Sequence, residues 1–477
     1  MIGKASDSAI DPRSANPWPL GIAIVLRLTL GAVLVATLVP TCIDEYFRVY
    51  HALHFWLNPS LLPSTNWLPL YVWLYGPVVG ALGETVFAPR AASLVIGGIG
   101  AFVASRDSAD DEERRARVLL ASCVPTGVLL YSSPLTESLF GALVTAYVTA
   151  LARYRDDGHA RHALAASLAL LAACAARYEA WVLIPALAVG LGTRGPTDAR
   201  RALIFALALL PAVAPLRWMV HLAERVGDPW AFLGTIQRDQ FGPGSTSDAL
   251  GGASAPLAIA FVPALAALVY GAAPRRPQRI RLASAHGLLF AALFAALAAK
   301  GSLPSQLPSR LLHVPMLLAA PVVGFELVRR RATRSVLALA ALCVLSGLVS
   351  TLARPPGLPR DDLALAGRLR AELAADRNAM AVVQGPFPQV TSFVTASSAV
   401  GRVQVDGAGW RCPASIATCT FRCGTPQWLS AVRLVVADSE PLGRTLAANG
   451  FLVIARSQRY RLWRSTNAQT LLCRPAR

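Results

Sequence analysis

The sequence predicts a mainly α-helical, polytopic integral membrane protein with about eleven transmembrane helices, an amphipathic external first loop and a small C-terminal α/β extracytoplasmic domain. Three observations predict this fold class. Hydrophobic residues make up 54% of the chain and charged residues only 15%, with a mean hydropathy of +0.48, which is typical of membrane proteins. Long apolar runs alternate with short arginine-bearing loops. Residues 354–477 return to the mixed composition of a soluble domain.

The first apolar run, residues 20–41, is long enough to cross a bilayer, which takes roughly 20 predominantly apolar residues. No small-residue cleavage site precedes it, so we expect it to stay in the membrane as a signal anchor. Lys4 and Arg13 precede this run. Because positive residues favour the cytoplasmic side, residues 1–19 are expected to form a cytoplasmic N-terminus.

Five arginine-bearing loops divide the rest of the apolar sequence, and all five are expected to face the cytoplasm. They cover residues 106–117, 153–161, 194–201, 275–281 and 329–334. The apolar runs around them cover residues 89–105, 118–133, 138–152, 163–176, 180–192, 202–222, 256–273, 283–299, 311–328 and 335–353. Together with the first run they complete a transmembrane domain of residues 20–353. The formal net charge of +18 therefore reflects topology, and not a nucleic-acid partner, since the arginines are spread between the spans.

Two stretches admit more than one topology. Residues 163–192 are short for two helices, but an even number of crossings is needed there, and Arg177-Tyr178-Glu179 would otherwise lie in hydrocarbon. One long tilted helix is the alternative. Residues 68–83 are apolar enough for a further span, yet counting them as a span would reverse the predicted side of the membrane for every later loop. We expect an amphipathic or re-entrant helix at the outer interface, inside an external first loop of residues 42–88.

This topology places the polar residues that can carry chemistry on one, non-cytoplasmic side. Asp44 and Glu45 follow the first span, and Glu137 precedes the run at residues 138–152. An acidic pair at a helix end can be a simple cap, but the first loop also holds several histidines and aromatic residues, which favours a cleft. The other candidates on this side are Arg177, Asp228, Lys300, Arg310 and His313. His51 and His54 lie three positions apart and suggest either a zinc site or, preferably, packing and hydrogen bonding.

The tail, residues 354–477, reads as an α/β domain with a helix at residues 361–376 and strands at residues 380–383, 433–437 and 451–455. It has no obvious catalytic set, so a covering or acceptor-binding role is preferred. Four cysteines lie in it: Cys412, Cys419, Cys423 and Cys473. Disulfides in an oxidising compartment are favoured over zinc, because no histidine follows His313 and paired C-x-x-C knuckles are absent.

At the level of pattern, residues 20–330 resemble the membrane-embedded GT-C glycosyltransferases that use polyprenyl-phosphate sugars. These include protein O-mannosyltransferases, aminoarabinose transferases and PIG-V-like mannosyltransferases. Asp44-Glu45 resembles the acidic motif of the family's first external loop, and Glu137 the acidic residue of its second. The other similar segments are residues 66–70 followed by Arg90, residues 132–140, residues 177–181, residues 227–232 with Gln237, and residues 308–312.

The resemblance implies inverting transfer of a hexose or mannose-like sugar from a polyprenyl-phosphate donor to an extracytoplasmic glycan, lipid or protein acceptor. Such transfer needs a base for the acceptor hydroxyl and a cation for the departing phosphate. Asp44 is the candidate base, with Glu45 assisting. Arg310 with His313 one helical turn away is the candidate phosphate clamp. Membrane lipids are the expected surroundings of the site.

The remaining candidates each have a simpler explanation. Arg177 and Lys300 are weaker phosphate ligands, since cations near span ends commonly snorkel to the interface and Arg177 can pair with Glu179. Asp228 is either a substrate contact or a cap for the helix that starts at Pro229. Glu137 alone is a poor metal site, so no divalent metal is expected.

The alanine- and arginine-rich composition favours a bacterial plasma (inner) membrane. The alternative function is a multi-span transporter or lipid flippase of the cell envelope. That class predicts ionisable residues near the bilayer midplane and related halves of the chain, whereas the acidic candidates lie in outer loops and no internal repeat is evident.

Overall fold

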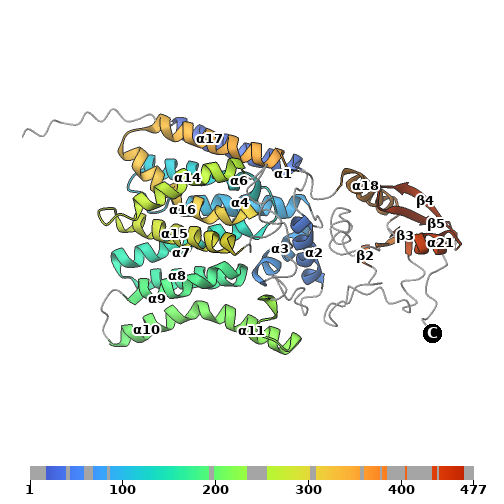
Figure 1. The fold of residues 1–477 in the computed structure, drawn as a ribbon, viewed down its shortest axis with the longest axis horizontal. Helices are drawn as coiled ribbons and strands as arrows, with labels where there is room; N and C mark the ends of the chain where they lie inside the picture. Colours follow the sequence, from blue (N-terminus) through green and yellow to red (C-terminus); the bar gives the residue numbers. More distant parts are fainter. Residues whose placement is uncertain are drawn as a thin grey trace, which may run out of the picture.

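The computed structural model describes residues 18–38, 43–57, 68–82, 86–192, 198–233, 255–300, 308–354, 359–376, 379–383, 403–405, 432–437, 440–448 and 450–466 of the chain. Its main body is a bundle of helices that run roughly side by side. Two short helices cover one end of the bundle, and the C-terminal α/β unit lies beyond them (Figure 1).

The helices of the bundle follow one another along the chain with short breaks. They are α1 (Trp18–Thr37), α4 (Phe87–Ala104), α5 (Asp111–Ser122), α6 (Pro125–Leu130), α7 (Thr136–Asp157), α8 (Ala160–Ala176), η1 (Tyr178–Val182), α9 (Leu183–Gly192), α10 (Asp198–Leu209), η2 (Leu210–Ala212), α11 (Val213–Val226), α14 (Ala255–Gly271), α15 (Gln278–Ala299), η4 (Pro308–Leu312), α16 (His313–Arg329) and α17 (Thr333–Leu352).

The expectation of a mainly α-helical membrane protein is confirmed. Among the described residues, six helices are long and apolar enough to cross a membrane. They cover Pro19–Thr37, Phe87–Ala104, Ala202–Val226, Gln278–Ala299, Arg310–Arg329 and Thr333–Leu352. The other apolar helices are shorter, and the total of eleven spans stays a prediction.

The single span expected at residues 118–133 is instead two helices, α5 and α6, which separate just before Pro125. Proline has no N–H to continue the hydrogen-bond ladder, but it is well suited to the first turn of a new helix. Arg27 of α1 satisfies carbonyl groups at this break: its Nε donates to the Ser122 carbonyl at 2.9 Å and its Nη2 to the Gly127 carbonyl at 3.3 Å. Arg27, which is distant in the sequence, thus donates hydrogen bonds to the backbone at this break inside the bundle.

The division of residues 163–192 into two helices is confirmed. Helix α8 ends at Ala176, and Arg177 adopts an extended conformation with φ −150° and ψ 143°. After η1, helix α9 returns along α7, and the Tyr154 hydroxyl donates to the Leu191 carbonyl at 3.4 Å. The break places Arg177 at the end of the bundle that carries the short covering helices.

These covering helices, α2 (Ile43–Leu57) and α3 (Leu70–Leu82), form the part of the external first loop that the structure describes. They pack closely, because a Cβ at Gly76 would lie only 2.9 Å from the Ala52 carbonyl oxygen. Tyr71 and Tyr75 of α3 are buried, with ring centroids 4.3 Å apart. Helix α3 therefore turns an aromatic face towards the bundle, but Trp73 and Leu74 are exposed, so the helix is apolar on both sides and not amphipathic. Its place at the membrane interface stays a prediction.

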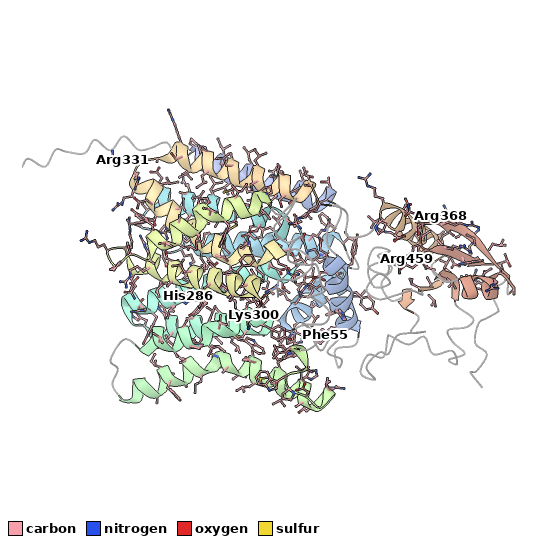
Figure 2. The ribbon with its side chains drawn as sticks, viewed as in Figure 1. Phe55, His286, Lys300, Arg331, Arg368 and Arg459 are labelled. Carbon is pink, nitrogen blue, oxygen red and sulfur yellow. The ribbon has the colours of Figure 1, made fainter. Side chains whose placement is uncertain are left out.

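The arginine-bearing loops gather at the opposite end of the bundle. Arg153 binds Asp107 at 2.6 Å, and the Thr333 hydroxyl donates to Glu112 at 2.6 Å, so three of the loops are joined directly. Arg331 lies at this end, far from α2 and α3 (Figure 2). The segregation of these loops from the candidate site is the arrangement that the loop pattern predicts.

The C-terminal unit contains a five-stranded sheet with the order β2-β1-β3-β5-β4. The strands are β1 (Met380–Val383), β2 (Val403–Val405), β3 (Val432–Ala437), β4 (Phe451–Arg456) and β5 (Arg461–Ser465). Strand β1 pairs in parallel with β2 and β3, whereas β5 pairs antiparallel with β3 and β4.

Helix α18 (Arg360–Ala375) packs its apolar face against this sheet, and α21 (Glu440–Ala448) connects β3 to β4. Strands β1, β3 and β4 coincide with the expected segments, whereas β5, with the sequence RLWRS, was not expected. Tyr50 of α2 packs against the same apolar cluster as α18, so α2 contacts both the bundle and this unit. The four tail cysteines lie outside the described residues.

Candidate active site

Helix α2 carries the acidic pair in its first turn, where carboxylates interact favourably with the helix dipole. Asp44 accepts a hydrogen bond from Arg310, with Oδ2 and Nη1 2.8 Å apart. The two residues are 266 positions apart in the sequence. The Arg310 side chain is 4% exposed and that of Asp44 is 21% exposed. The structure thus brings the expected base and the expected phosphate ligand into direct contact.

Glu45 lies in a different ion pair. Its Oε2 is 3.3 Å from Arg90 Nη2, both side chains are buried, and Arg90 also donates to the Leu38 carbonyl. Consecutive residues of an α-helix point about 100° apart, so Asp44 and Glu45 face different neighbours. The geometry gives Glu45 the role of tying α2 to α4 and to the end of α1.

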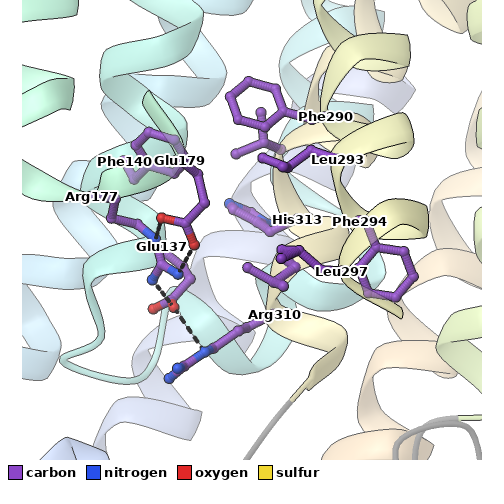
Figure 3. A pocket seen from close by; sticks show the side chains of 12 residues that line it. Glu137, Phe140, Arg177, Glu179, Phe290, Leu293, Phe294, Leu297, Arg310 and His313 are labelled. Carbon is purple, nitrogen blue, oxygen red and sulfur yellow. Dashed lines mark hydrogen bonds and ion pairs between the residues drawn. The ribbon is translucent and has the colours of Figure 1, made fainter. Parts of the chain in front are cut away.

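Glu137, at the start of α7, joins the two arginines of the site. Arg177 donates through Nη1 to Glu137 Oε1 and to Thr136 Oγ1, the latter at 3.0 Å. Arg310 Nε lies 3.4 Å from the same Glu137 oxygen. Arg177 also donates through Nε and Nη2 to Glu179, with the Nε bond at 3.1 Å. Figure 3 shows Glu137 between the two guanidinium groups.

The charges around Glu137 keep it ionised. It precedes the apolar run at residues 138–152, outside the expected span. Burial by itself would raise the pKa of its carboxyl, but the positive charges of Arg177, Arg310 and Arg48 lower that pKa to about 2. Glu137 is therefore a permanent anion that holds the arginines at fixed positions.

His313, the first residue of α16, is fully buried beside Arg310. Its Nδ1 and the Thr126 Oγ1 are 3.0 Å apart, and the Tyr131 ring lies edge-on at 5.4 Å. Its Nε2 has no hydrogen-bond partner among the described residues. A Cβ at Gly141 would lie 3.0 Å from this nitrogen. Glycine at position 141 thus leaves room on the α7 side of the His313 ring.

These side chains line a pocket of about 380 Å³ that has a polar and an apolar side (Figure 3). The polar residues are Glu137, Arg177, Glu179, Arg310 and His313. The apolar residues are Phe140, Phe290, Leu293, Phe294, Leu297, Leu311 and Val314. Most of the apolar wall belongs to α15, so the pocket joins a polar site with two arginines and two glutamates to a hydrocarbon-like surface. Asp44 and Glu45 are not among the residues that line this pocket, although Asp44 binds Arg310, which does line it.

Two further expected site residues also lie outside the lining of this pocket. Asp228 is exposed after α11, and its Oδ1 accepts a hydrogen bond from the backbone N–H of Trp230 at 2.8 Å. Lys300 is exposed at the C-terminal cap of α15. The geometry gives Asp228 a turn-capping role. Gln237 and the side chain of His54 lie outside the described residues.

Asp228→Asn is expected to leave both stability and activity almost unchanged. An asparagine Oδ1 can accept the same bond from Trp230, and an exposed substitution of this kind changes stability by less than about 0.5 kcal/mol. The measurement is the melting temperature together with the rate of sugar transfer. A rate reduced more than threefold would show that Asp228 contacts a substrate.

Sequence reasoning did not assign a role to Arg48 or Thr126. Arg48 is buried under the Tyr71 ring, with its Cζ 5.6 Å from the ring centroid, and its charge acts on both Glu137 and Asp44. It lies four positions after Asp44, on the same face of a helix, and this spacing is the signal that points to it. Thr126 lies in an apolar run without such a signal.

No protein-family model matches the sequence, and no curated protein matches it. Among solved structures, the chain is similar to ArnT from Cupriavidus metallidurans bound to undecaprenyl phosphate, with a TM-score of 0.64 and 13% identity over 96% of this chain and 100% of that one. ArnT is a GT-C glycosyltransferase. This chain has the GT-C fold. The apo state of the same ArnT gives a TM-score of 0.64 and 13% identity over 94% of this chain and 98% of the other.

The oligosaccharyltransferase of Archaeoglobus fulgidus in its apo form gives a TM-score of 0.48 and 11% identity, over 90% of this chain and 70% of that one. The likeness to ArnT confirms, at the level of the fold, the GT-C resemblance drawn from residues 20–330. The GT-C fold of ArnT extends over almost the whole of this chain, the C-terminal unit included.

Proposed function

We propose that this protein is a GT-C glycosyltransferase that transfers a sugar from a polyprenyl-phosphate donor to an acceptor hydroxyl. The observation that carries the proposal is the contact between Asp44 and Arg310 beside a pocket with an arginine-bearing polar side and an apolar side. A lipid phosphate has the same two parts, an anionic head and a hydrocarbon chain. The likeness in fold to ArnT, which was crystallised with undecaprenyl phosphate, supports this donor class.

The donor phosphate would bind at Arg310, with the first prenyl units against α15. Arginine suits this role because its guanidinium binds phosphate bidentately and stays charged in a buried site. Phe290, Phe294 and Leu297 provide the apolar wall. His313 lies next to Arg310, and its Nε2 is a second potential donor to a phosphate oxygen.

The reaction would be a single displacement at the anomeric carbon of the sugar. Asp44 accepts the proton of the acceptor hydroxyl as that oxygen forms a bond to the anomeric carbon. The bond between this carbon and the phosphate oxygen breaks, and its electron pair leaves with the polyprenyl phosphate. Arg310 stabilises the negative charge of that leaving group. Attack from the opposite face inverts the configuration of the sugar.

We propose that arginine side chains, and not a divalent metal, balance the negative charge of the phosphate. Glu137 is held by two guanidinium groups and Asp44 by one. These carboxylates are therefore already neutralised by cationic side chains. We also propose that the site faces the outside of a bacterial inner membrane, with the arginine-bearing loops in the cytoplasm.

The test is a transfer assay in proteoliposomes with a panel of polyprenyl-phosphate sugars and an extract of cell-envelope material. We expect one donor to be consumed, polyprenyl phosphate to be released, and the sugar to become covalently attached to an acceptor. Movement of an intact donor across the bilayer, without a new glycosidic bond, would instead favour a flippase. A folded protein that neither consumes nor binds any donor would refute the proposal.

Arg310→Ala is expected to raise the KM for the donor by about 10- to 100-fold, since a hydrogen bond to a charged group contributes about 1.5–3 kcal/mol. Arg310→Lys should recover part of this loss, because it restores the charge but not the bidentate geometry. Initial rates at varied donor concentration measure the effect. An unchanged KM in a folded Arg310→Ala protein would show that Arg310 only pairs with carboxylates.

A further inference from the structure

Asp44 and a donor phosphate compete for the same side chain, the guanidinium of Arg310. Asp44 Oδ2 lies 2.8 Å from Arg310 Nη1, which is a full charge-assisted hydrogen bond. Nη1, one of the guanidinium nitrogens that a bidentate phosphate would use, is thus already bound to the proposed base.

The displacement reaction cannot proceed from this arrangement. In this reaction the attacking hydroxyl and the leaving phosphate lie on opposite sides of the anomeric carbon. Because the base contacts the hydroxyl, the base and the leaving phosphate must be apart. A carboxylate bound to the phosphate ligand lies on the side of the leaving group. The Asp44–Arg310 pair must therefore open before transfer.

The second partner of Arg310 indicates which contact opens. Glu137 is 3% exposed and is also held by Arg177, so it stays in place. Asp44 is 21% exposed and lies in the first turn of α2. Of the two carboxylates, Asp44 is the one that can leave at low cost. Glu137 then keeps the Arg310 guanidinium oriented for the incoming anion.

We propose that the donor phosphate displaces Asp44 from Arg310, so that the base becomes available only when the donor is bound. This inference rests on the proposed function and deepens it, because it makes the donor the first substrate to bind. Without a donor, Asp44 stays paired and does not activate an acceptor hydroxyl or water.

The experiment measures the affinity of the full-length protein in nanodiscs for undecaprenyl phosphate, with the uncharged polyprenol as the control ligand. Asp44→Asn and Asp44→Ala remove the competing charge, and we expect them to tighten binding of the phosphate about fivefold or more, which is about 1 kcal/mol. Polyprenol binding should not change. Asp228→Asn removes an equal charge outside the pocket and should leave both affinities at the wild-type value.

A double-mutant cycle identifies the atom in competition. In the Arg310→Ala background, Asp44→Asn should no longer increase the affinity, because nothing remains to be released. Equal or weaker phosphate binding by both folded Asp44 variants would overturn the exchange while leaving the donor site intact. Tighter binding that persists without Arg310 would also overturn it. A wild-type protein that does not bind undecaprenyl phosphate would overturn both the exchange and the proposed function.

Discussion

Asp44→Asn is expected to lower the rate of sugar transfer by a factor of about 10²–10⁴, the usual contribution of a positioned general base. Asparagine keeps the shape of the side chain and can still accept a hydrogen bond from Arg310, but it cannot take a proton. The loss should therefore appear in kcat and not in KM for the donor. The measurement is the initial rate at saturating donor, together with the melting temperature as a test of folding.

Two further variants test whether the carboxylate of Asp44 is the base. Asp228→Asn makes the same chemical change in an exposed turn and should keep the wild-type rate. Asp44→Glu, which moves the carboxylate by one methylene, should recover part of the activity. Turnover close to wild type in folded Asp44→Asn would remove Asp44 from the base role. If Asp44→Asn lowers kcat and also binds undecaprenyl phosphate more tightly, the Asp44 carboxylate contributes to catalysis while it weakens phosphate binding.

Glu137→Gln is expected to destabilise the protein by about 3 kcal/mol, because it leaves two buried guanidinium groups without their shared anion. A pKa that falls from 4.5 to about 2 in the folded state corresponds to about the same free energy. We expect a clear fall in the melting temperature in detergent. Glu179→Gln is the comparison, since Glu179 binds the same Arg177 but is 20% exposed and should cost less.

The same residue predicts a pH dependence. The pKa of Glu137 is lower in the folded than in the unfolded protein, so its contribution to stability is complete above about pH 4.5 and is lost as the pH falls towards 2. The wild-type melting temperature should decrease over this interval, and the decrease should be smaller in Glu137→Gln. Equal melting temperatures of the two proteins at neutral pH would contradict the central place given to Glu137.

The fold class and the grouping of the site followed from the sequence because a bilayer imposes strong, local rules. Apolar runs of sufficient length predict helices, and arginines in alternate loops set the parity of the crossings. Parity, together with the cost of placing Arg177-Tyr178-Glu179 in hydrocarbon, divided residues 163–192 into two helices. The same topology placed Asp44, Glu137, Arg177 and Arg310 at one end. The break before Pro125 was missed, since the Ser122 carbonyl at the end of α5 accepts a hydrogen bond from Arg27, 95 positions away.

The pairing of charges was decided by tertiary structure alone. Asp44 and Glu45 are neighbours in sequence, but the turn of the helix directs one to Arg310 and the other to Arg90. Asp228 and Lys300, which the topology places on the same side, remain outside the pocket. The sequence specified which residues gather at one end of the bundle, because the lengths of the apolar runs and the arginines between them set the direction of the helices. The contacts of α2 with η4 and α4 decided which of them touch, because hydrogen bonds act only over about 3 Å.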